Sequence, residues 1–421
     1  MASQLIQQVR VIDPVTPLDQ VADVRVVDGQ ITAIGASLTQ DGDALIAGQG
    51  KVLLPGLIDL YSHSGEPGNE SRETLASLLR AGGAGGFTRI GLLPTTQPTI
   101  DSPALVADLQ YRRNTLARSQ TVPQLALWGA LTQAAQGDSL TELAELAAAG
   151  IVGFTDSRPL QNPLLLRRVL EYAQPLKKPL AFWPCDRTLV GQGVAREGDY
   201  SLIYGLPGDP ALSETTALAT LLECVAAIGT PVHVMRLSTA RGVELVSQAK
   251  AAGLPITVST TWMHLLHSTA DLKTYDVNLR VAPPLGNPED QAALIEAVAD
   301  GRIDAIAVDH RPYTYEEKTV GFPSAPPGVI GLELALPLLW QTFVATQRWP
   351  ATTLVQRLSS GPAACLGQQP PRLQPHQPAE MILFDPEARW EVSSATLHSH
   401  ASNTPWLGQT LQGQVLQLWS G

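Results

Sequence analysis

The chain contains little cysteine and no long apolar run. Its three cysteines, Cys185, Cys224 and Cys365, are far apart, and no Cys-x-x-Cys pair occurs. This excludes a disulfide framework and a thiolate zinc site. No run of about 18 apolar residues is present, which excludes a membrane-spanning helix. The first ten residues lack the charged and apolar regions of a signal peptide, so we expect a cytoplasmic protein.

Charged residues are also scarce. They make up 16% of the 421 residues, and 39 acidic against 28 basic side chains give a net charge of -11. Phosphate binding needs a basic face, and the lysines and arginines do not cluster, so nucleic acid is excluded as a partner. Apolar residues make up 44%, which predicts a large buried core. The length suits one large barrel with a smaller appendage.

Both ends of the chain are predicted to be rich in β-strands. They contain short apolar runs broken by turn signals such as Asp-Pro and Asp-Gly. The expected strands are 8–11, 22–27, 31–34, 44–46, 381–384 and 414–419. Two β-rich ends around an α/β middle predict one small β-sandwich, composed of residues 1–54 and 374–421.

The middle of the chain, residues 55–373, alternates apolar strands with helical patterns such as 73–81, 139–148, 164–173, 214–228 and 240–252. Eight strands are expected at 57–60, 89–93, 124–130, 151–154, 180–183, 232–237, 256–260 and 305–308. Eight β/α units in this order predict an α/β fold, a (β/α)8 TIM barrel whose chemistry lies at the C-terminal ends of the strands. Residues 184–213 and 313–331 are expected to be loops over that face.

The first barrel strand ends in a segment typical of metal-dependent hydrolases, with one change. Residues 54–68 read Leu-Pro-Gly-Leu-Ile-Asp-Leu-Tyr-Ser-His-Ser-Gly-Glu-Pro-Gly. In a strand that ends in Asp-x-His-x-His, alternate residues point the same way, so two imidazoles can bind one ion. Here Tyr61 occupies the first imidazole position and His63 the second.

Nearly the whole chain resembles the dihydroorotase family of the amidohydrolase superfamily. The resemblance rests on residues 54–68 and on the motifs at 84–88 and 403–406, which occur at the family's spacings. It implies six metal-ligand positions, of which three are retained (His63, Asp156 and Asp309) and three are replaced (Tyr61, Trp183 and Arg236). It also implies that Asp309 is the vestigial general base of the family reaction.

The substrate-binding positions that the resemblance implies are changed as well. Gly65 replaces the arginine that binds the substrate carboxylate, and glycine cannot supply its bidentate fork. Thr95 and Ala282 each replace an asparagine, and Tyr313 replaces a histidine. We therefore expect no substrate-binding residue to remain at these positions.

Arg236 is the replacement that argues most strongly against a metal. A fixed positive charge about 4 Å from a cation costs several kcal/mol per unit charge at an effective dielectric of about 20. We therefore expect no metal and no other cofactor. Buried carboxylates without an ion would be unpaired anions. We hypothesise that Arg236 supplies positive charge to Asp309, Asp156 or both, while Trp183 and Tyr61 fill the vacated volume.

The other histidines of interest are expected to have packing roles. His233, three residues before Arg236 on an alternating strand, faces the opposite way and is predicted to be a core imidazole. His264 and His267 are spaced like a shared site, but packing at the surface or against the residues of the site is predicted for them. His398 and His400 are expected to lie far from the barrel mouth.

Three functions remain open on the sequence. The resemblance implies an inactive dihydroorotase homologue of pyrimidine biosynthesis that is a non-catalytic partner of aspartate transcarbamoylase, and we expect a homo-oligomer. The second function is an active cyclic-amide hydrolase with an altered zinc site, in which His63 and Asp309 bind the ion and Tyr61 is an oxygen ligand. The third is a sensing module in which Arg236 binds a small anion without turnover.

Overall fold

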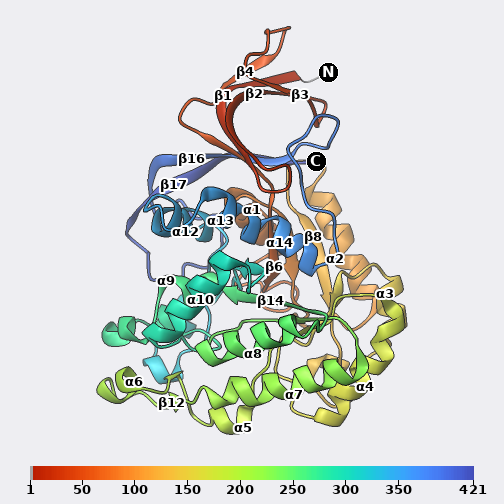
Figure 1. The fold of residues 1–421 in the computed structure, drawn as a ribbon, viewed down its shortest axis with the longest axis vertical. Coiled ribbons are helices and arrows are strands. Elements are labelled where there is room, and N and C mark those ends of the chain that lie inside the picture. The colour runs from red at the N-terminus through yellow and green to blue at the C-terminus, as the bar shows by residue number, and fades with distance from the viewer. Residues whose placement is uncertain (1–2) are drawn as a thin grey trace.

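The structure is a computed structural model that describes residues 3–421, and its centre is a parallel (β/α)8 barrel (Figure 1). The barrel strands form two four-stranded sheets, in the orders β6–β7–β8–β9 and β10–β13–β14–β15, and a bridge between Phe154 and Leu180 joins them. They are β6 (Leu57–Ser62), β7 (Phe87–Leu92), β8 (Gln124–Gly129), β9 (Gly153–Phe154), β10 (Ala181–Phe182), β13 (Val232–Val234), β14 (Ile256–Thr261) and β15 (Ala305–Ala307). The predicted fold class is confirmed.

Asp59 closes the barrel between its last strand and its first. The buried Asp59 carboxylate accepts hydrogen bonds from Val308 N at 2.8 Å and from Ser62 Oγ at 2.6 Å. His63 N donates to His310 O at 2.8 Å, beside this contact. Burial raises the pKa of Asp59 to about 7. The aspartate of the segment 54–68 therefore has a structural role, because its carboxylate links the chain just after β15 to β6.

The helices surround the barrel, and each of the five predicted helices overlaps one of them. The principal helices are α1 (Leu75–Ala84), α2 (Pro103–Leu116), α3 (Leu143–Ala148), α4 (Pro163–Ala173), α7 (Leu212–Ile228), α8 (Ala240–Ala251), α10 (Pro288–Asp300), α12 (Ala335–Leu339), α13 (Ala351–Leu358) and α14 (Ser360–Cys365). Local sequence sets their ends. At α4, for example, the Asn162 side chain accepts from Leu164 N and Leu165 N, and Pro163 occupies the first helical position.

Three barrel strands are shorter than the sequence pattern predicts. The apolar runs 151–154, 180–183 and 232–237 contain only the two- or three-residue strands β9, β10 and β13. The chain leaves the ladder early because Trp183 and Arg236 turn into the barrel mouth. Arg236 has a φ of 57°, which lies outside the β region of backbone conformations.

The stretch 184–213 is more ordered than the loop that was predicted. It contains α5 (Arg187–Val190), β11 (Ala195–Arg196), α6 (Asp199–Ile203) and β12 (Gly208–Asp209), and β11 pairs with β12 in parallel. Asp186 begins α5 by accepting hydrogen bonds from Thr188 N and Leu189 N. The second predicted loop, 313–331, contains the short helix α11 (Tyr315–Lys318).

Strands from both ends of the chain form one seven-stranded sheet beyond the barrel (Figure 1). Its order is β17–β16–β5–β1–β2–β3, and β4 pairs with β1. The strands are β1 (Ser3–Asp13), β2 (Leu18–Val27), β3 (Gln30–Gly35), β4 (Ala44–Ala47), β5 (Val52–Pro55), β16 (Glu380–Glu391) and β17 (Thr410–Ser420). The predicted strands at both ends are confirmed. The domain bounds 1–54 and 374–421 stay a prediction, and residues 1 and 2 lie outside the described residues.

Arg89 on β7 fastens this sheet to the barrel. Its guanidinium binds Glu380 of β16 through Nε and Nη2, both at 2.7 Å, and Thr88 Oγ1 donates to the same carboxylate.

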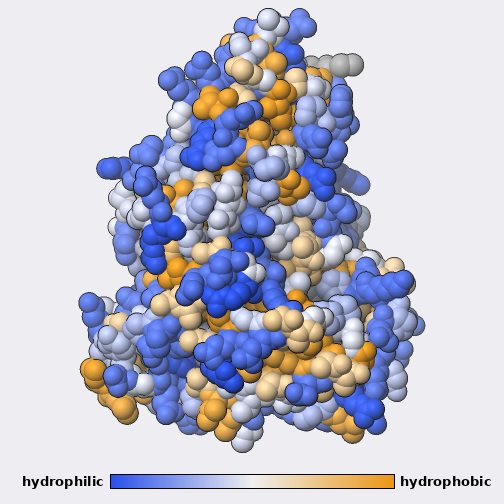
Figure 2. Space-filling model, in the orientation of Figure 1, coloured by the Kyte–Doolittle hydropathy of each residue, from blue (hydrophilic) through white to orange (hydrophobic). Residues whose placement is uncertain are grey.

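The surface of the molecule carries both polar and apolar side chains, and an apolar patch lies over α6, where Leu202 and Ile203 are exposed (Figure 2). Within residues 3–421, no helix combines the length and apolar character needed to cross a bilayer.

Candidate functional site

Three residues with left-handed backbone converge at the barrel mouth. Ser157, Arg236 and Asp309 follow β9, β13 and β15, and their φ angles are 55°, 57° and 51°. A positive φ is unfavourable for residues with a Cβ, costing about 1–3 kcal/mol where surrounding structure enforces it. Such conformations are concentrated at functional sites, so these strand ends are candidates for the functional site.

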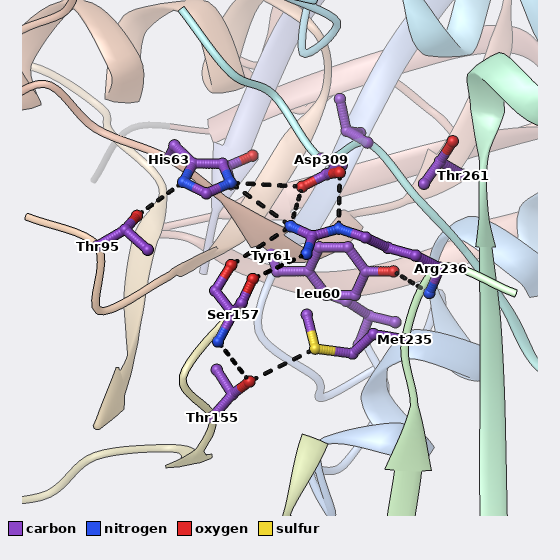
Figure 3. A network of polar contacts seen from close by, with 12 residues as sticks. Leu60, Tyr61, His63, Thr95, Thr155, Ser157, Met235, Arg236, Thr261 and Asp309 are labelled. Atoms are coloured by element: carbon purple, nitrogen blue, oxygen red, sulfur yellow. Dashed lines mark hydrogen bonds and ion pairs between the residues drawn. The ribbon is translucent and has the colours of Figure 1, made fainter. Parts of the chain in front are cut away.

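Arg236 and Asp309 form a bidentate ion pair at this point (Figure 3). Arg236 Nε lies 2.8 Å from Asp309 Oδ2, and Nη2 lies 2.6 Å from Oδ1. Arg236 Nη1 donates to Ser157 O at 3.2 Å, and the Arg236 side chain is only 1% exposed. Burial alone would raise the pKa of Asp309, but the Arg236 guanidinium outweighs it and holds that pKa well below its usual range. The predicted pairing of Arg236 with Asp309 is confirmed.

Two aromatic rings enclose the guanidinium of Arg236. Its Cζ lies 5.3 Å from the ring centroid of Tyr61 and 5.1 Å from that of Trp183, within cation–π range. The Tyr61 hydroxyl accepts from Arg236 N at 3.2 Å and shares a hydrogen bond with Ser259 Oγ at 2.9 Å. Burial raises the pKa of Tyr61, so its phenol stays neutral. Tyr61 and Trp183 therefore fill the space around Arg236, as predicted.

His63 and His233 are both buried and neutral. His63 Nδ1 bonds Thr95 Oγ1 at 2.7 Å, and its Nε2 lies 3.6 Å from Asp309 Oδ1. Burial, together with the charge of Arg311, lowers the pKa of His63 to about 3. His233 bonds Thr257 Oγ1 at 2.9 Å and Ser259 Oγ at 2.8 Å. Burial lowers its pKa to about 3 as well, and its predicted role as a core imidazole is confirmed.

Asp156 is not part of this cluster, which corrects its predicted place beside His63 and Asp309. Its carboxylate accepts from Leu131 N at 2.8 Å, from Thr132 N at 3.0 Å and from Thr132 Oγ1 at 2.6 Å. The neighbouring Ser157 faces Arg236 instead, with its hydroxyl 3.4 Å from Arg236 Nη2. Two adjacent residues at a strand end point in opposite directions, so only one of them can face the barrel centre.

The residues at the barrel centre do not fit the metal centre that the family resemblance implies. Of the three predicted surviving ligands, only His63 and Asp309 lie together. Arg236 Nη2 lies 2.6 Å from Asp309 Oδ1 and 3.5 Å from His63 Nε2. A cation bound to these two donors would face this fixed charge. Across residues 3–421, no group of three or more His, Cys, Asp or Glu side chains is arranged to hold a metal ion.

The predicted substrate positions surround a cavity of about 680 Å³ beside the ion pair, and all four line it: Gly65, Thr95, Ala282 and Tyr313. Gly65 has no room for a side chain, because a Cβ there would meet backbone atoms of Glu73 at 2.6 and 2.8 Å and Asn69 O closer still. The Thr95 hydroxyl forms a hydrogen bond with His63 Nδ1. The Tyr313 ring is approached by the cationic groups of Arg72, Arg311 and Lys318, at 5.0, 5.9 and 5.3 Å from its centroid.

The same cavity contains arginines that sequence reasoning missed. They are Arg72, Arg158, Arg187, Arg196, Arg280 and Arg311. Three of them, Arg187, Arg196 and Arg311, lie on or next to the two stretches predicted to be loops over the barrel mouth. Arg72, Arg158 and Arg280 lie outside those stretches. All of these arginines are scattered along the sequence and only the fold brings them together.

The remaining histidines have structural contacts. His264 is buried, and its ring forms hydrogen bonds with Thr261 Oγ1 at 2.7 Å and Pro284 O at 3.2 Å. The His267 ring packs beside Trp406, with centroids 5.3 Å apart. His400 donates its backbone N–H to Glu73 at 2.9 Å. None of these contacts brings an imidazole to the Arg236–Asp309 pair.

Comparisons with known proteins identify the family. Residues 50–241 match the family model described as dihydro-orotase-like. The chain is 43% identical to a probable dihydroorotase-like protein of Synechocystis sp., with 99% of each chain covered, and 38% identical to the dihydroorotase of Deinococcus radiodurans, with 90% of each covered. The L-hydantoinase of Arthrobacter aurescens shares the fold, with a TM-score of 0.85 at 22% identity over 100% of this chain and 97% of that one. The chain therefore belongs to the dihydroorotase-like family of the amidohydrolase superfamily.

Proposed function

We propose that this protein is a non-catalytic dihydroorotase-like subunit of pyrimidine biosynthesis. The observation that carries the proposal is the Arg236–Asp309 pair, which occupies the centre of the barrel mouth. Both Asp309 oxygens accept from the guanidinium, and the pKa of Asp309 is held low. A general base works best with a pKa near the operating pH and with an oxygen free to take the proton. Asp309 meets neither condition.

Zinc content and turnover test the loss of catalysis. We expect protein purified without chelators to contain far less than one zinc per chain, even after incubation with zinc, because a guanidinium faces the two remaining donors. We also expect no hydrolysis of dihydroorotate. The dihydroorotase of Deinococcus radiodurans, purified and assayed alongside, is the positive control. Stoichiometric zinc with turnover of any cyclic amide would favour the active hydrolase with an altered metal site.

We propose aspartate transcarbamoylase as the partner, supported by the family resemblance alone. Purification of the tagged chain from its own cells is expected to recover aspartate transcarbamoylase in a fixed ratio. Light scattering of the purified chain without that enzyme also tests the expected homo-oligomer. A preparation that contains no aspartate transcarbamoylase at low ionic strength would contradict the proposed partner. A monomeric chain would contradict the expected homo-oligomer.

A further inference from the structure

The cavity at the barrel mouth is strongly positive in a protein whose net charge is -11. Six arginines line it, and only two carboxylates do, those of Asp209 and Glu214. Arg72 is neutralised by Glu317, with Nε 2.9 Å from Oε2. Within residues 3–421, no carboxylate lies at ion-pair distance from four of the others, Arg158, Arg187, Arg280 and Arg311. The metal-ligand and substrate positions implied by the family resemblance do not account for this charge.

Both carboxylates of the cavity are already held by donors of the protein. Glu214 accepts from the backbone N and Oγ of Ser238 at 2.9 and 2.6 Å, and from N and Oγ1 of Thr239 at 3.1 and 2.6 Å. Asp209 Oδ1 accepts from Ser213 Oγ at 2.6 Å. These carboxylates organise the wall of the cavity, and the arginines keep an excess of positive charge that faces its interior.

Arg196 is the buried member of this group, and one of its N–H groups has no partner. The β11–β12 ribbon places it in the cavity wall, where it is 1% exposed. Its Nη2 donates to Ser238 Oγ at 2.9 Å and its Nη1 to Asp209 O at 3.3 Å. Nη1 also lies 3.6 Å from Asp209 Oδ2, so this carboxylate balances part of its charge. Across the described part of the chain, Arg196 Nε finds no hydrogen-bond acceptor. An unpaired buried donor costs about 1–3 kcal/mol, and a ligand acceptor that reached Arg196 Nε would remove that cost.

Arg280 and Arg311 form a second basic wall against the 325–328 segment. Arg280 Nε donates to Ala325 O at 2.8 Å, which holds its guanidinium in place. Arg311 lies along Gly328, where an added Cβ would be only 2.8 Å from the Arg311 side chain. Arg311 and Lys318 both lie against the Tyr313 ring, and burial, with the charges of Arg280 and Arg311, lowers the pKa of Lys318 to about 7.

We propose that this cavity binds a small molecule with at least two anionic groups, carboxylate or phosphate, through Arg196, Arg280 and Arg311. A volume of about 680 Å³ is within the range of small-molecule sites. Arginine forks match the geometry of both kinds of anion. The site differs from the one the sequence suggested, because Arg236 is neutralised by Asp309 and does not line the cavity. It requires neither a metal nor aspartate transcarbamoylase, so it stands apart from the proposed function.

Titration calorimetry of the full chain with inorganic pyrophosphate and with citrate tests the proposal. We expect at least one probe to bind, more weakly as salt is raised. Arg280→Gln and Arg311→Gln are each expected to weaken binding roughly tenfold or more, since each removes a charged hydrogen-bond donor. Arg118→Gln is the matched control: it removes the same charge from an exposed residue outside the cavity and should leave binding unchanged.

The outcomes show which class of ligand binds and, separately, whether the cavity binds an anion at all. Binding of pyrophosphate alone indicates a phosphorylated ligand, and binding of citrate alone indicates a polycarboxylate. Thermal unfolding without probe shows whether each variant is folded, and Arg311→Lys, which keeps the charge, should retain more affinity than Arg311→Gln. Absence of binding by both probes, or equal weakening by Arg118→Gln, would overturn the proposal.

Discussion

Arg236→Met is expected to lower the free energy of unfolding by about 3–5 kcal/mol, because it leaves Asp309 as a buried anion without a cation. Asp309 is only 16% exposed, so solvent compensates little of that loss. The expected result is a large fall in the urea midpoint at neutral pH with an unchanged m-value. The double variant Arg236→Met with Asp309→Leu removes both charges and should recover much of the loss. Undiminished stability in Arg236→Met would refute the idea that Arg236 neutralises this site.

The effect of Arg236→Met should depend on pH in a defined direction. In the natural protein the folded-state pKa of Asp309 is lowered, so its contribution to stability is present above the unfolded pKa of about 4 and is lost as pH falls through the folded pKa. In the variant, burial without a cation raises that pKa, so the carboxyl destabilises the fold at neutral pH. The difference between the two proteins is therefore largest near pH 7 and shrinks below about pH 4. A difference that stays constant with pH would mean that lost packing, not charge, explains the variant.

Gly65→Ala is expected to destabilise the fold by about 3 kcal/mol or more, although it adds a single methyl group. The new Cβ would lie 2.6 Å from Glu73 O and 2.8 Å from Glu73 N, and backbone atoms cannot move aside as a flexible side chain can. Thermal unfolding measures the effect. An arginine at this position, which would match the family pattern, meets the same obstacle at its first side-chain atom. The loop after β6 has therefore closed over the position of the substrate-binding arginine.

Gly321→Ala is the matched control for Gly65→Ala. Gly321 has a φ of -63° and no atom within 4 Å of the position of a Cβ, so alanine should be neutral or slightly stabilising there. If Gly65→Ala unfolds at the same temperature as Gly321→Ala, the loop around Gly65 adapts. A substrate-binding arginine at position 65 would then be sterically possible.

The sequence was sufficient to place the main members of the site. Strand ends of a barrel meet at one face, and the family resemblance implied that Tyr61, His63, Trp183, Arg236 and Asp309 lie together there. The chemistry of Arg236 followed from charge balance, since a buried carboxylate needs a cation nearby. Short-range pattern and elementary electrostatics are enough when a residue sits at a fixed distance from a strand that the pattern identifies.

Two features lay beyond the sequence for physical reasons. Asp156 and Ser157 are adjacent, and a left-handed φ of 55° at Ser157 decides which of them faces Arg236. No local sequence pattern predicts that φ angle. The position of Arg196 depends on the pairing of β11 with β12, two strands of two residues each. A pairing so short leaves no periodicity, and contacts with the barrel determine it rather than local propensity.

The guanidinium of Arg236 is a cation attached to the polypeptide by covalent bonds. A bound metal must be acquired after synthesis and is lost to chelators or to scarcity, whereas this charge is present in every copy as soon as the chain is made. Each chain carries one such cation at any metal concentration. Under the proposed function, the charge at the barrel mouth does not depend on a trace element. The proposed function therefore predicts that this protein folds equally well in a cell that is starved of zinc and in a replete one.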